Sequence, residues 1–90
     1  MAHAAVIRVK IDSDSDRQHR QSILSDFVIP EARALPDFQK GMWMNDGRGT
    51  GTCIVVFDTA EHAAAAITPL TAAEGPPVIR SDVYEVEAEA

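Results

Sequence analysis

The chain has 90 residues, a length that predicts one domain over residues 1–90. It carries 8 Lys and Arg residues against 14 Asp and Glu residues, and its formal net charge of −6 argues against a nucleic-acid-binding protein. No apolar run approaches the roughly 20 residues that span a membrane, and no signal peptide is expected, so we expect a cytoplasmic protein with no membrane contact.

The first part of the chain predicts a strand and then a long helix. Residues 4–11 alternate between Ala5, Ile7, Val9 and Ile11 on one face and Val6, Arg8 and Lys10 on the other. Apolar residues at positions 24, 28, 32 and 35 predict an amphipathic helix from about residue 14 to 35. Pro30 should kink or break this helix, because proline lacks a backbone donor and crowds the preceding turn.

The second part predicts a hairpin, a second helix and a last strand. Residues 39–45 and 51–57 are the hairpin strands, and the turn between them contains two glycines. Asp58-Thr59-Ala60-Glu61 resembles a capping box and should begin a helix that Pro69 kinks or shortens. The apolar row of this helix is Ala60, Ala63, Ala64, Ile67 and Leu70. Residues 78–88 predict a strand that presents Arg80, Asp82, Tyr84, Val86 and Ala88 on one face.

The order of these elements is β-α-β-β-α-β, which predicts an α+β, ferredoxin-like fold. Right-handed crossovers give a four-stranded antiparallel sheet in the order 4-1-3-2, with two helices on one face. The other face carries apolar residues and should not stay in water. We therefore expect a homodimer in which two sheets pack face to face.

Five short motifs, spread over essentially all 90 residues, carry a family resemblance. They are Ile7-Arg8-Val9-Lys10, Ile29-Pro30, Pro36-x-Phe38-x-x-Gly41-x-Trp43, Val55-Val56-Phe57-Asp58-Thr59-x-Glu61 and Tyr84-Glu85-Val86. As a set they resemble the small antibiotic-biosynthesis-monooxygenase-like (ABM-like) domains of the dimeric αβ-barrel superfamily, of the stand-alone actinobacterial type. The resemblance implies a homodimeric barrel that binds a small molecule without a cofactor. A histidine frequent in the second helix of these monooxygenases corresponds to Ala66 here.

Candidate site residues come from strand faces and one helix start. Trp43 either stacks on a planar substrate in the barrel cavity or packs in a core or a dimer interface, and a one-residue slip in register changes the face on which it lies. Arg8 holds a carboxylate, phenolate or enolate, or pairs with Asp82, or is simply exposed near the end of the barrel. His62 begins the second helix and is a candidate general base. The candidate catalytic residues are Arg8, Asn45, Tyr84 and His62, and the candidate ligand-binding residues are Trp43, Asn45, Arg8, Tyr84 and Asp82.

No pair of histidines has metal-ligand spacing, so no metal site is predicted, and Cys53 is expected to be a buried apolar residue. Three functions stay open. The first is a cofactor-independent monooxygenase-like enzyme that acts on a small aromatic or polyketide-like compound. The second is a non-catalytic module that binds or senses a ligand. The third is a packed interaction domain without a cavity, and fold alone does not choose among them.

Overall fold

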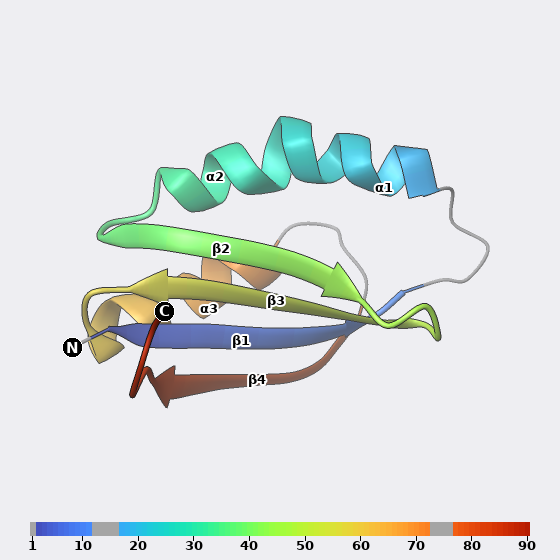
Figure 1. The fold of residues 1–90 in the computed structure, drawn as a ribbon. Helices are drawn as coiled ribbons and strands as arrows, with labels where there is room; N and C mark the ends of the chain where they lie inside the picture. Colours follow the sequence, from blue (N-terminus) through green and yellow to red (C-terminus); the bar gives the residue numbers. More distant parts are fainter. Residues whose placement is uncertain (1, 12–16, 73–76) are drawn as a thin grey trace.

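Four antiparallel strands form one sheet in the computed structural model, which describes residues 2–11, 17–72 and 77–90. They are β1 (His3–Lys10), β2 (Phe38–Asn45), β3 (Thr50–Phe57) and β4 (Val78–Glu85), in the order β2-β3-β1-β4 (Figure 1). This order and the α+β class confirm the sequence-based prediction. The last strand ends at Glu85 and not at Ala88, although the Val86 amide still donates to the Ala2 carbonyl at 2.9 Å.

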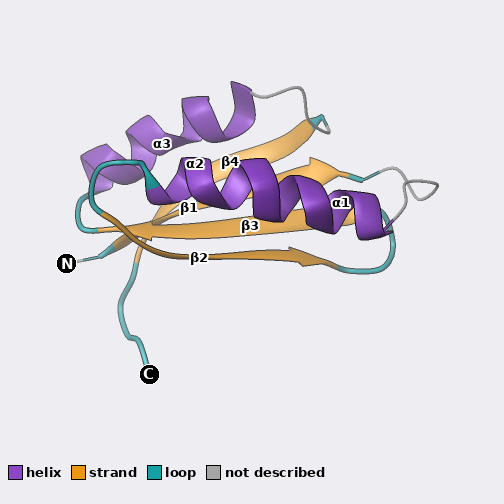
Figure 2. Ribbon diagram, turned by 90° about the horizontal axis from the view of Figure 1, so that it is seen from above, coloured by secondary structure: helices purple, strands orange, loops and turns teal. Residues whose placement is uncertain are grey.

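Two helical regions lie on one side of the sheet (Figure 2). The first helix runs without interruption through α1 (Arg17–Ile23), the π-helical segment η1 (Leu24–Val28) and α2 (Ile29–Arg33). This first helix lies alongside β2, whereas α3 (Ala60–Ala72) packs on β1, β3 and β4. The predicted start near residue 14 lies outside the described residues. No helix of the described residues is long and apolar enough to cross a membrane.

Pro30 does not break the first helix, because the turn before it is π-helical. The Ile29 amide donates to the Leu24 carbonyl, five residues earlier. Proline has no amide proton to donate, and its ring crowds the carbonyl four residues before it. The wider π turn relieves this crowding, and the helix continues to Arg33. The predicted distortion is therefore a local widening of the helix.

The second helical region begins one residue later than a cap at Asp58 would place it. Thr59 is the N-cap, and its Oγ1 accepts a hydrogen bond from the His62 amide at 3.2 Å. Pro69 lies inside α3, which nevertheless continues to Ala72. The predicted apolar row was wrong at Ala64, which is exposed, because the packed row of α3 is Ala63, Ala66, Ile67 and Leu70.

The hydrophobic core lies between the sheet and the helices. Its fully or nearly fully buried members are Ala5, Val55, Phe57, Ala63 and Ala66. The ring of Phe38 meets the ring of Phe57 edge to face, with centroids 6.3 Å apart and planes at 77°. These contacts attach the start of β2 to the centre of the core.

No described helix covers the opposite side of the sheet, which we call the open face. Strand register places on it Val6 and Arg8 of β1, Met42 and Met44 of β2, Ile54 of β3, and Arg80, Asp82 and Tyr84 of β4. The two methionines and Tyr84 are exposed. The C-terminal residues leave the sheet on this side (Figure 2), and Glu89 forms an ion pair with Lys40 at 2.5 Å.

Candidate functional site

Trp43 faces the helices, and an irregularity in β2 is the reason. Phe38 lies opposite Phe57, but the pairing then shifts, so that Lys40 lies opposite Val56 and Trp43 opposite Cys53. An uninterrupted strand would turn residues 38 and 43 to opposite faces, because side chains alternate. The shift lets Phe38 and Trp43 both pack against the core. Trp43 is thus on the helix side of the sheet and not on the open face.

A groove of about 870 Å³ separates the first helix from β2, and we call it the β2 groove. One wall is β2 from residue 38 to residue 44, and the other is a stripe of the first helix that contains Gln21, Leu24, Ser25, Ile29 and Arg33. Because β2 is an edge strand, its outward backbone N–H and C=O groups have no partner strand. The volume is within the range of about 300–1,000 Å³ common for small-molecule sites.

The π turn helps to align the groove-lining residues of the first helix along one face of that helix. Gln21, Ser25, Ile29 and Arg33 follow one another at four-residue steps. In an α-helix each such step overshoots a full turn by about 40°, so a long row drifts around the helix. A π turn contains more residues and offsets this drift. Pro30, through the π turn before it, therefore keeps Arg33 on the side of Gln21.

Gly41 allows the indole of Trp43 to lie over the β2 backbone. A Cβ atom on residue 41 would be 2.9 Å from Cη2 and 3.0 Å from Cζ3 of Trp43. Those separations are too short for non-bonded carbon atoms, so any larger residue would displace the ring. The pair Gly41 and Trp43 therefore forms a fixed aromatic surface in the groove.

Asn45, a candidate catalytic and ligand-binding residue, makes a structural contact in the hairpin turn. Its Oδ1 accepts a hydrogen bond from the Gly47 amide at 3.0 Å. In the same turn the Asp46 carboxylate accepts bonds from the Arg48 and Thr50 amides, and these bonds lower the pKa of Asp46. Both side chains stabilise the β2–β3 hairpin, and Asn45 does not line the β2 groove.

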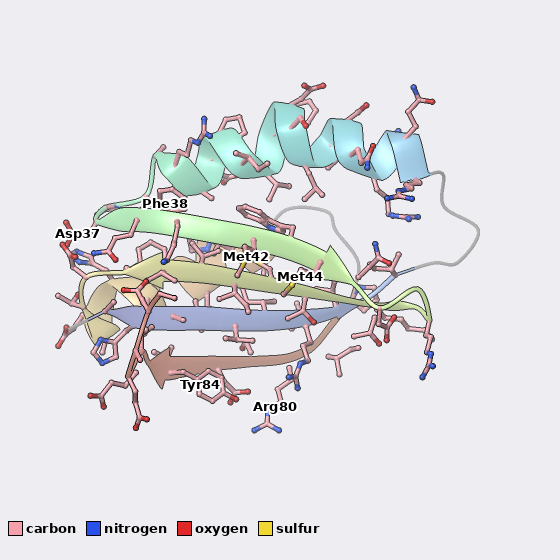
Figure 3. The ribbon with its side chains drawn as sticks, viewed as in Figure 1. Asp37, Phe38, Met42, Met44, Arg80 and Tyr84 are labelled. Atoms are coloured by element: carbon pink, nitrogen blue, oxygen red, sulfur yellow. The ribbon has the colours of Figure 1, made fainter. Side chains whose placement is uncertain are left out.

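The other ligand-binding candidates lie on the open face, away from Trp43. Arg8 is opposite Arg80 in β4, while Asp82 is opposite Val6. The Asp82 carboxylate accepts a hydrogen bond from Arg80 Nε at 2.6 Å, so the Arg8–Asp82 pair considered from the sequence is replaced by a pair within β4. Figure 3 shows Arg80 and Tyr84 on this strand and the two methionines on β2. The predicted candidates are thus divided between two sides of the sheet.

His62 makes a close contact that joins α3 to the turn before β2. Its Nδ1 lies 2.5 Å from Asp37 Oδ2 and 3.1 Å from Thr59 Oγ1. Asp37 has a φ of 58°, an uncommon value that Asp adopts more easily than most residues. Neither His62 nor Asp37 lines the β2 groove, so the structure does not bring the candidate general base to Trp43. Asp37 had not been singled out from the sequence.

Cys53 lies opposite Trp43 in the neighbouring strand β3 and is half-buried. Burial raises the pKa of its thiol from 9.0 to about 11, because the apolar surroundings disfavour the thiolate. The folded thiol therefore stays protonated as the pH rises past 9, whereas the unfolded thiol ionises. This group contributes to stability below about pH 9, and the contribution is lost as the pH approaches 11.

Cys53 should react slowly with iodoacetamide in the folded protein. A pKa of about 11 in place of 9.0 lowers the thiolate fraction near pH 8 by about 100-fold. The rate can be followed by mass spectrometry and compared with the rate in 8 M urea (roughly full denaturation). Equal rates in the folded and unfolded protein would contradict the burial of this thiol.

The groove includes polar residues that the sequence did not identify as site residues. These residues are Gln21, Ser25 and Arg33 of the first helix. Their spacing of four and eight residues is a weak signal, because it is also common on solvent-exposed helix faces. Among the described residues, no group of three or more His, Cys, Asp or Glu side chains could hold a metal ion.

The sheet and two helices define the ferredoxin-like α+β class, and three solved structures share this fold. The monooxygenase from the gene ActVA-Orf6 of Streptomyces coelicolor, in complex with the ligand Nanaomycin D, has a TM-score of 0.67 and 12% identity over 99% of this chain and 90% of that chain. Rv0793 from Mycobacterium tuberculosis has a TM-score of 0.60 and 16% identity over 100% of this chain and 99% of that chain.

MupZ from Pseudomonas fluorescens has a TM-score of 0.61 and 16% identity over 91% of this chain and 66% of that chain. No family model and no curated protein matches the chain. The three likenesses show the fold, and they confirm the ABM-like fold expected from the sequence motifs.

Proposed function

We propose that the protein binds a small, flat organic molecule in the β2 groove. The observation that carries the proposal is the indole of Trp43, held over Gly41 at a groove of about 870 Å³. An aromatic surface of this kind suits stacking with a planar ring. The outward backbone groups of β2, which have no partner strand among the described residues, offer hydrogen bonds to its polar substituents. The likeness to a monooxygenase solved with a bound ligand supports the same conclusion.

Cofactor-independent oxygenation of an aromatic or polyketide-like compound is the second candidate function. Two observations give this oxygenase function less support than the binding function. In the part of the chain that the structure describes, no Asp, Glu or His side chain lines the β2 groove, so no described residue of those types is there to act as a general base. Ala66, at the position where the family resemblance implies a histidine, is buried in the core beside Ala63. In this candidate reaction the substrate itself supplies the electrons that reduce oxygen.

We also propose that two copies associate through the open face. Val6 and Ile54 lie opposite each other at its centre, with exposed Met42, Met44 and Tyr84 beside them. One end of this face carries Arg8, Lys10 and Arg80, and the C-terminal segment with Glu87 and Glu89 lies towards the other end. A two-fold axis perpendicular to the strands would set each basic end over the partner's acidic segment.

Binding can be measured with 1-naphthol and related naphthalene derivatives as probes. Because Trp43 is the only tryptophan, its indole N–H gives one resonance in a ¹⁵N correlation spectrum. Titration should shift this resonance, and calorimetry should show binding about tenfold weaker for Trp43→Leu. Tyr84→Leu is the matched control, because Tyr84 lies on the open face. If none of these probes shifts the indole resonance at concentrations up to its solubility limit, the groove is excluded as their binding site.

The same probe separates the two candidate functions. Monooxygenation of 1-naphthol would consume one O₂ and give 1,4-naphthoquinone and water, a balanced reaction that needs no added reductant. Mass spectrometry of the mixture therefore tests catalysis directly. A bound probe that is recovered unchanged would favour the binding function, and enzyme-dependent quinone formation would favour the oxygenase.

A further inference from the structure

We infer that the ligand of the β2 groove is an anion: a flat apolar molecule that carries a carboxylate, with Arg33 as its main charged contact. This inference rests on the proposed binding function and names the chemical class of the ligand. It follows from the charge of the groove, the partners of its two cations and the character of its walls.

The charge of the groove is opposite to the charge of the chain. The sequence has 14 Asp and Glu residues and a net charge of −6. Among the described residues that line the groove, Arg33 and Lys40 are cationic and none is acidic. Cations gathered in a concave site raise the local concentration of anions, even on a protein that repels them elsewhere. An anionic ligand is therefore the charge class that this groove favours.

Arg33 is available to bind such an anion. It lies at the end of α2, its side chain is exposed, and it forms no ion pair or side-chain hydrogen bond with another described residue. A guanidinium offers two parallel N–H donors that match the two oxygens of a carboxylate. No internal contact has to be broken before Arg33 binds a ligand.

Lys40 lies at the rim of the groove, but its side chain is already paired. Strand register places this side chain on the open-face side of β2, together with Met42. Its ammonium lies 2.5 Å from the carboxylate of Glu89, which comes from the C-terminal segment. Both side chains are substantially exposed, so this pair contributes little to stability. Arg33 is therefore the cation that is free to bind a ligand in the groove.

The walls of the groove require that the rest of the ligand be apolar and flat. Trp43 and Phe38 supply aromatic surface from β2, and Leu24 and Ile29 supply aliphatic surface from the first helix. An inorganic anion would leave these side chains without contacts. A fused aromatic ring with one carboxylate satisfies both the apolar walls and Arg33.

The test compares 2-naphthoate with 2-naphthamide, which has nearly the same shape but no charge. Calorimetry of the full chain should give a dissociation constant about tenfold lower for the naphthoate. Arg33→Gln should remove this preference by weakening the naphthoate alone. Arg48→Gln is the matched control, because it changes the net charge equally but lies in the β2–β3 turn, outside the groove. Far-ultraviolet circular dichroism confirms that each variant is folded.

The possible results test the binding function and the charge of the ligand separately. Equal binding of the two probes, with the Trp43 indole resonance shifted by both, would overturn the inference about charge and leave the binding function standing. A preference for naphthoate that persists in Arg33→Gln, or that Arg48→Gln reduces as much, would also overturn it. If neither probe shifts the indole resonance, both the proposed function and this inference fail.

Discussion

Replacement of Phe57 by alanine is expected to remove about 3–5 kcal/mol from the free energy of unfolding. Phe57 is 0% exposed and meets Phe38 edge to face in the centre of the core. A domain of this length commonly has about 5–13 kcal/mol in total, so the loss is a large fraction of it. Urea denaturation, followed by circular dichroism, measures the change.

Phe27→Ala is the matched control for this variant. Phe27 lies in η1 and is 67% exposed, so the same replacement there should change the free energy of unfolding by no more than about 0.5 kcal/mol. If the two variants lost equal stability, the core would not be where the structure places it. The comparison holds residue type constant and varies burial alone.

Ile54→Lys is expected to raise the dissociation constant of the proposed dimer by at least about 100-fold. Ile54 lies opposite Val6 at the centre of the open face, and a partner sheet would enclose the new ammonium without a counter-charge. An unpaired charge buried in this way costs several kcal/mol, which amounts to a factor of 100 or more in affinity. Sedimentation equilibrium measures the constant, and the lysine is tolerated in the monomer because the site is only half-buried.

The same change at Ile79 separates interface disruption from added charge. Ile79 is 58% exposed on the edge strand β4, and alternation along the strand turns it away from the side of Arg80. Ile79→Lys should leave association unchanged. A wild-type protein that stays monomeric at millimolar concentration would refute the dimer, and an unaffected Ile54→Lys dimer would place the interface elsewhere.

Much of the fold could be predicted because its signals are local. Alternation in β1 puts Ala5 and Ile7 on one face, and both are buried on the helix side. The glycine turn marks the hairpin, and Gly47 and Gly49 indeed have positive φ. Each of these features depends on residues close together in the chain, so they can be recognised without the rest of the protein.

The side to which Trp43 points could not be predicted in this way. The run Met42-Trp43-Met44 is apolar on both faces, so its pattern does not choose between them. The face on which Trp43 lies is set by the register shift between Phe38 and Lys40, which depends on pairing with β3. The same holds for His62, whose partner Asp37 is far away in sequence.

The order of elements, and with it the sheet topology, was determined by the sequence itself, because strand alternation, turn residues and helix periodicity are properties of neighbouring residues. The candidate site was decided by the tertiary structure. A register shift in β2 turned Trp43 towards the helices, and the π turn before Pro30 placed Arg33 along the same groove. Both depend on contacts between distant segments or on a small change in helix geometry, and neither produces a periodic pattern in the sequence.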